Sequence, residues 1–129
     1  YHLNRAVEPL VGFIDQLTNW YIRRSRARFW AEEASRDRDE AFETLYTVIL
    51  TLAKIAAPFI PFLSDAIYLQ LKADGAPESV HLCDFPIYDS RLRDEKLESE
   101  MVYVQEVVSL GHGLRKEHKL KVRQPLAKA

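Results

Sequence analysis

Cysteine, glycine and long apolar runs are scarce in this sequence of 129 residues, and each scarcity excludes a class of site. Because Cys83 is the only cysteine, neither an intrachain disulfide nor a cysteine-based zinc site can form. The four glycines form neither a G-x-G-x-x-G nor a P-loop pattern, so no glycine-rich phosphate loop is expected. No run of about 18 uncharged apolar residues occurs. We therefore expect a cytoplasmic protein without a membrane partner.

Side chains that perform chemistry do not occur in the arrangements that catalysis requires. Glu78 and His81 have the Glu-x-x-His spacing of helical di-metal sites, but those sites need two such pairs on helices, and this one lies in a proline-flanked loop. His112, His118 and Cys83 have no sequence-local base or nucleophile beside them. We predict no catalytic residue and no metal ligand in this chain.

Apolar residues recur at helical spacing along most of the sequence, which predicts an all-α bundle. The first helix is expected over residues 3–17, with Thr18 or Asn19 ending it, so that the arginine-rich stretch that follows forms a short helix of its own. The second helix is expected to begin at Ser35 or Asp37 and to reach residue 57. Because it is apolar on two faces, we expect other helices around it.

The second half of the chain is punctuated by proline and glycine. Pro58 and Pro61 predict the start of a third helix, and a loop with a short extended piece at residues 80–83 is expected after it. A last helix is predicted from about Arg93, with fraying or a bend at Gly111 and Gly113. Alternating apolar residues over 120–126 predict a strand. In total, we expect a bundle of four to five helices.

The formal net charge is only −1, but the charges are sorted by segment. Residues 19–31, the arginine segment, contain four arginines and no acid, while acidic residues crowd the stretch that follows. A second basic block near the C-terminus has only Glu117 against it. One-sided electric fields are therefore possible on a nearly neutral chain. The cations are Arg23, Arg24, Arg26 and Arg28 in the first group and Arg115, Lys116, Lys119, Lys121, Arg123 and Lys128 in the second.

Two interpretations of the arginine segment are open from the residues alone. Guanidinium groups pair bidentately with phosphates and stack on bases, so arginines interleaved with aromatics favour contact with RNA. Alternatively, the aromatics pack in a core while the arginines form surface ion pairs with the following acids, each worth about 0–1 kcal/mol. On a helical projection no single basic stripe emerges. In the second block, Arg115 and Lys116 suit a helix C-terminus, whereas the cations beyond it do not.

Three ordered motifs make the sequence specific: LTNWYIRRSRARFW at residues 17–30, SVHLCDFP at 79–86 and KVRQPL at 121–126. Together they closely resemble the anticodon-binding region of isoleucyl-tRNA synthetase, a class I aminoacyl-tRNA synthetase, over essentially the whole chain. The valyl and leucyl enzymes share this helical domain, but the Arg-Arg-Ser-Arg run is most similar to the isoleucyl enzymes. Since the sequence opens within a helical pattern and without methionine, we expect a piece of a longer chain.

The resemblance implies a fold of the class Ia anticodon-binding type, with the helical domain at residues 1–118 and the start of a truncated C-terminal segment at 119–129. It implies tRNA for isoleucine and the remaining domains of the parent enzyme as partners. The family's His-x-Gly-His and Lys-Met-Ser-Lys-Ser signatures are absent from this sequence, so ATP-dependent ligation is expected only in the parent. ATP, and zinc where it is bound, are likewise expected in the parent and not in this fragment.

Eight cations are the candidate RNA-binding residues that the resemblance and the charge pattern select. Trp20 is expected to be a packing residue. The rival hypotheses are the anticodon-binding domain of a valyl or leucyl synthetase, and a helical module that docks on an acidic protein surface without binding RNA. The eight candidates are Arg23, Arg24, Arg26, Arg28, Lys116, Lys119, Lys121 and Arg123.

Overall fold

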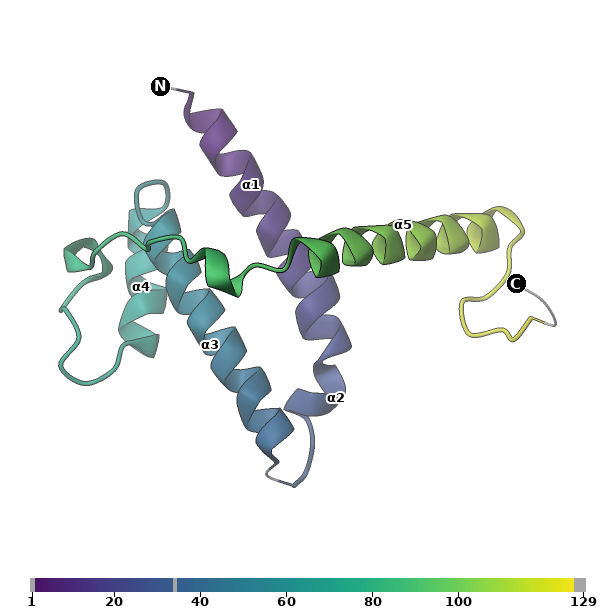
Figure 1. Cartoon of the computed structure of the whole chain (residues 1–129), viewed down its shortest axis with the longest axis horizontal. Coiled ribbons are helices and arrows are strands. Elements are labelled where there is room, and N and C mark those ends of the chain that lie inside the picture. Colours follow the sequence, from purple (N-terminus) through teal and green to yellow (C-terminus); the bar gives the residue numbers. More distant parts are fainter. Residues whose placement is uncertain (1, 34, 127–129) are drawn as a thin grey trace. The chain divides into compact units, whose positions relative to one another are not determined.

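The computed structural model describes residues 2–33 and 35–126, apart from the side chain of Leu3. All regular secondary structure in this part of the chain is helical, which confirms the all-α class (Figure 1). The chain divides into two compact units, Tyr1–Ile87 and Tyr88–Ala129. The predicted domain boundary after residue 118 stays a prediction. Within the described residues, no helix has both the length and the apolar character needed to cross a membrane.

The first helical segment is longer than the sequence predicted. It runs from α1 (Leu3–Gln16) through the π-helical turn η1 (Leu17–Ile22) and on to Arg24, with Pro9 inside α1. The predicted end at Thr18 or Asn19 is wrong because both side chains bond back to the preceding turn. The Thr18 hydroxyl donates to the carbonyl oxygens of Ile14 at 2.9 Å and Asp15 at 3.1 Å, and Asn19 Nδ2 donates to Asp15 Oδ1 at 2.6 Å. The helix continues through these residues as a π-helical turn instead of stopping.

A short helix, α2 (Arg26–Phe29), follows as predicted and is fastened to the next helix by aromatic side chains. The ring of Phe29 lies edge-on to Tyr21, with centroids 6.3 Å apart, and to Phe42, at 5.1 Å. We call Tyr21, Phe29 and Phe42 the aromatic cluster. The Tyr21 hydroxyl also donates to the carbonyl of Ala41 at 3.2 Å, and Ala41 is fully buried. This cluster fixes the point where the chain reverses direction.

The longest helix of the first unit is α3 (Arg36–Ala56), and it packs against α2, α4 and η2. The predicted start at Ser35 is confirmed: this residue has φ −134°, and its hydroxyl accepts from the backbone N–H of Arg38 at 3.2 Å. Ala41, Ala53 and Ala56 are buried, whereas the large apolar side chain of Phe42 is 48% exposed. Small side chains therefore mark the closest contacts of α3.

Helix α4 (Pro61–Leu71) begins with Pro61 at its first turn, as predicted. The core beside it consists of Ala57, Tyr68 and Val80, with Cys83 packed against them. Tyr68 is 2% exposed and donates its hydroxyl to the carbonyl of Pro77 at 3.0 Å. Hydrogen bonding with Cys83 and then burial raise the pKa of Tyr68 to about 12, so the phenol stays protonated at neutral pH. The buried phenol of Tyr68 thus holds the loop after α4 by its hydrogen bond to Pro77.

The loop after α4 is also held by a carboxylate. Asp65 Oδ1 accepts from the Ser79 hydroxyl at 2.7 Å and from the backbone N–H of Val80 at 2.9 Å. The extended piece predicted at residues 80–83 is wrong, because η2 (Val80–Leu82) is a 3₁₀ turn. Its cause is local: the Ser79 hydroxyl accepts from the backbone N–H of His81 at 3.2 Å and caps the turn.

The second unit contains the 3₁₀ turn η3 (Ser90–Leu92) and α5 (Glu95–Glu117). Asp94 caps α5 by accepting from the backbone N–H of Leu97 at 3.0 Å. Of the fraying or bend predicted at Gly111 and Gly113, the fraying is wrong, since α5 continues through both glycines to Glu117.

A Schellman turn ends α5. The backbone N–H of Leu120 donates to the carbonyl of Arg115 at 2.8 Å, and that of Lys119 to the carbonyl of Lys116 at 3.1 Å. The strand predicted over 120–126 is wrong, because these residues are irregular, with a turn at Val122 and Arg123. Arg115 Nη1 folds them back by donating to the carbonyls of Lys121 at 2.8 Å and Gln124 at 3.0 Å.

Replacing Asp65 by asparagine should lower the melting temperature at neutral pH and weaken its dependence on pH. The hydrogen bonds from Ser79 and Val80 hold the pKa of Asp65 below its usual value. A carboxyl with a depressed folded-state pKa adds stability above its unfolded pKa of about 3.9 and loses it as pH falls through the folded pKa. Thermal melts followed by circular dichroism at neutral and acidic pH test this, with Asp74→Asn as the control. Equal pH dependence in wild type and Asp65→Asn would contradict it.

Replacing Lys119 by glycine should stabilise the end of α5 by about 1 kcal/mol, because an L-residue in the left-handed region costs about 1–2 kcal/mol. Lys119 has φ 54° and is the one non-glycine residue with positive φ in the described part of the chain. Urea unfolding followed by helical circular dichroism measures the change. Lys121→Gly, outside this position, is the matched control and should not stabilise.

Candidate nucleic-acid interface

The arginine segment folds into two successive helical pieces whose aromatic side chains fix their positions. Arg23 and Arg24 lie in the last turn of the first helical segment, and Arg26 and Arg28 lie in α2. Ser25, which is 8% exposed, separates the two pairs and accepts backbone N–H groups from Arg28 and Phe29 through its carbonyl. Tyr21 and Phe29 lie on the side of these turns that faces α3, where they contact Ala41 and Phe42.

Arg28 differs from the other three arginines because it is held by Asp37. Its Nε donates to Asp37 Oδ2 at 2.9 Å, its Nη2 lies 2.8 Å from Oδ1, and the same Nη2 donates to the Asp37 carbonyl at 3.0 Å. Hydrogen bonding to Asp37 raises the pKa of Arg28 above its usual value. The contacts of Arg28 agree with the structural interpretation of the segment, since they join α2 to the first turn of α3.

Arg24 and Arg26 each lie over an indole ring. The guanidinium carbon of Arg24 is 5.6 Å from the ring centroid of Trp20, and that of Arg26 is 5.5 Å from the centroid of Trp30. Both distances are in the range of cation–π contacts, which contribute about 0.5–1 kcal/mol at exposed sites. These contacts orient the guanidinium groups without neutralising their charge.

Three exposed cations of the arginine segment thus keep their charge available. Arg23, Arg24 and Arg26 are exposed, and no carboxylate of a described residue forms an ion pair with any of them. The following acids are partly occupied elsewhere: Asp37 binds Arg28, and Glu40 binds Arg36 at 2.7 Å. A group of guanidinium cations with no acid among them suits a polyanion such as RNA.

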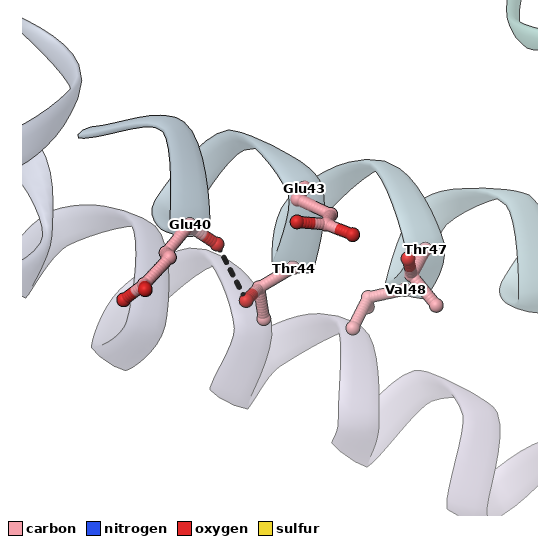
Figure 2. Close-up of a pocket in the computed structure, with 5 residues that line it drawn as sticks. All are labelled: Glu40, Glu43, Thr44, Thr47 and Val48. Carbon is pink, nitrogen blue, oxygen red and sulfur yellow. Dashed lines mark hydrogen bonds between the residues drawn. The ribbon is translucent and has the colours of Figure 1, made fainter. Parts of the chain in front are cut away.

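A hollow of about 470 Å³ lies along α3, and its lining differs in charge from the arginine segment. Figure 2 shows its lining of glutamate, threonine and valine side chains, and the hydrogen bond of 2.7 Å from the Thr44 hydroxyl to the Glu40 carbonyl. Glu40 and Glu43 give it negative charge, so it does not suit a phosphate backbone. The lining residues are Glu40, Glu43, Thr44, Thr47 and Val48.

The second basic block belongs to the second unit. Like the arginine segment, it contains one cation that is held by neighbouring groups and others that are exposed. Arg115 is engaged by the carbonyls of residues 121 and 124, so it shapes the turn after α5. The four predicted RNA-binding cations of this block are exposed, and no described carboxylate pairs with them. They are Lys116, Lys119, Lys121 and Arg123. For all eight candidates, contact with RNA stays a prediction.

Trp30 was missed by the sequence reasoning as a candidate for the interface. It is 69% exposed and lies beside Arg26, whereas Trp20 is half-buried. The spacing contained a signal: Trp20–Arg24 and Arg26–Trp30 are both separated by four residues, which places the two side chains of each pair on one helical face.

Comparison with known proteins gives one family over the full chain. The sequence model described as "Anticodon-binding domain of tRNA ligase" matches residues 1–129. An isoleucine–tRNA ligase of Protochlamydia amoebophila (strain UWE25) is 65% identical over 129 residues, which is 100% of this chain and 12% of that protein. The isoleucine–tRNA ligase of Chlamydia pneumoniae is 60% identical over 127 residues, 98% of this chain and 12% of that protein. The chain therefore spans about an eighth of the length of these relatives.

Replacing Arg28 by glutamine should lower the melting temperature, whereas Arg24→Gln should leave it nearly unchanged. Glutamine cannot reproduce the three contacts that Arg28 makes with Asp37, while Arg24 has only its stack on Trp20 to lose. Thermal melts of the two variants, which carry the same change of charge, provide the measurement. A larger loss of melting temperature in Arg24→Gln than in Arg28→Gln would contradict the structural role of Arg28.

Proposed function

The chain belongs to the family of anticodon-binding domains of tRNA ligases, and we propose on this basis that it binds the anticodon stem and loop of tRNA. We further propose that it does so as part of an isoleucine–tRNA ligase, with tRNA for isoleucine as its ligand. The names of relatives that are 58–65% identical support isoleucine over valine or leucine. The structural observation that carries RNA binding is the exposed, acid-free group formed by Arg23, Arg24 and Arg26.

This proposal assigns binding, and not chemistry, to these residues. The described part of the chain has no group of three or more histidine, cysteine, aspartate or glutamate side chains placed to hold a metal ion. On this proposal, the ATP-dependent joining of isoleucine to tRNA takes place in other domains of a longer cytoplasmic enzyme. ATP, and zinc where it is present, would be bound there. The contribution of this domain is to position the tRNA for that reaction.

The physical basis of binding is neutralisation of RNA phosphates by cations. Each phosphate that a guanidinium or ammonium group neutralises releases condensed counterions, so the affinity falls steeply as salt rises. Arginine adds a bidentate geometry that lysine lacks. Because phosphate contacts contain no sequence information, they would position the stem, and discrimination would come from unpaired bases of the loop.

Replacing Arg23, Arg24 and Arg26 together by glutamine should weaken tRNA binding and reduce its salt dependence. The slope of log K against log salt should fall by about 0.7–0.9 for each phosphate contact that is lost. The matched control replaces Arg36, Arg91 and Arg93, each paired with a carboxylate, and removes the same number of charges. Titration of tRNA at several salt concentrations gives both quantities. If wild-type protein does not bind tRNA, or the first variant has an unchanged affinity and slope, the proposal is wrong.

A further inference from the structure

We infer that Trp30, with the guanidinium of Arg26 over one face of its ring, is a stacking platform for an unpaired nucleobase. This inference rests on the RNA binding proposed above and names the part of RNA that the arginine segment recognises. The role proposed for the arginines is phosphate binding, whereas the role inferred for Trp30 is base stacking. The expected ligand is RNA with exposed base faces, and not a continuous duplex.

The first support is the exposure of the ring. Trp30 is 69% exposed although Arg26 lies 5.5 Å from its centroid. Much of the indole therefore remains open to a second planar group. Trp20 has a similar guanidinium neighbour, Arg24 at 5.6 Å, but it is half-buried. Of the two tryptophans in this sequence, Trp30 is the more exposed.

The second support is the way in which the ring is held. Trp30 follows the last residue of α2, and its backbone N–H donates to the carbonyl of Arg26 at 3.1 Å. Phe29 lies edge-on to it, with centroids 6.5 Å apart and an angle of 80° between the rings. Phe29 itself belongs to the aromatic cluster that fastens α2 to α3. A platform that is held before binding loses little conformational entropy on binding.

The third support is the charge around the ring. Residues 19–31 contain no acid, and Arg26 brings a cation directly to the indole. A nucleotide offers both partners that this pair needs: a π-face for the indole and a phosphate for the guanidinium. In a duplex, base faces are already covered by neighbouring base pairs, so only unpaired bases can stack on the platform.

Fluorescence of single-tryptophan variants tests the contact directly. In Trp20→Phe, Trp30 is the sole tryptophan, and in Trp30→Phe only Trp20 remains. The probes are an RNA hairpin with an unpaired loop and an RNA duplex with the same number of phosphates. The hairpin should quench the emission of Trp20→Phe, the duplex should not, and Trp30→Phe should respond weakly to both. Equal quenching of Trp20→Phe by the two RNAs, or none by either, would overturn the inference.

Affinity gives a second readout at fixed salt. Trp30→Leu should weaken binding of the hairpin by about tenfold and leave binding of the duplex unchanged, because the lost stacking surface serves only unpaired bases. Trp30→Phe, which keeps an aromatic face, should retain most of the affinity. An equal loss for both RNAs would indicate a structural role for Trp30 and would overturn the inference.

If wild-type protein binds tRNA with a steep salt dependence but Trp30→Leu binds the hairpin normally, phosphate binding stands and the platform is wrong. If wild-type protein binds neither RNA, both proposals are wrong.

Discussion

The edge-to-face packing of Tyr21, Phe29 and Phe42 is the constraint on which the arginine segment depends. It joins residues from the end of the first helical segment, from α2 and from the first half of α3, and the Tyr21 hydroxyl adds a bond to the Ala41 carbonyl. With these rings against α3, Arg23, Arg24 and Arg26 are exposed, whereas Arg28 reaches the first turn of α3. The ion pair of Arg28 with Asp37 fixes the same turn from its polar side. The aromatic cluster therefore both joins the helices and sets the positions of the arginines between its rings.

The sequence was informative at two helix starts. Ser35 and Pro61 begin helices because a hydroxyl can cap free N–H groups and proline needs no N–H in a first turn. Several errors arose where a side chain competes with the expected backbone pattern. Thr18 and Asn19 bond back to the preceding turn, and the Arg115 guanidinium gathers two carbonyls from residues that alternate like a strand. Such contacts depend on geometry that apolar periodicity does not contain.

The candidate interface was predictable as a segment but not as a set of equivalent residues. Composition placed four arginines together, and a helical projection could not say which of them would be neutralised. The decisive partner of Arg28 is Asp37, nine residues away on another helix, so only the fold brings them together. The contact of Arg26 with Trp30, in contrast, follows from a spacing of four residues and was within reach of the sequence.

The π-helical turn at Leu17–Ile22 separates the register of α1 from that of the arginine segment. A π turn accommodates one more residue than an α-helical path, and one residue corresponds to about 100° of rotation about a helix axis. Loss or gain of a residue in this turn before Tyr21 would therefore rotate α1 about its own axis relative to the aromatic cluster and the arginines that follow. The outward side of α1 can therefore change its register while the arginine segment keeps its own.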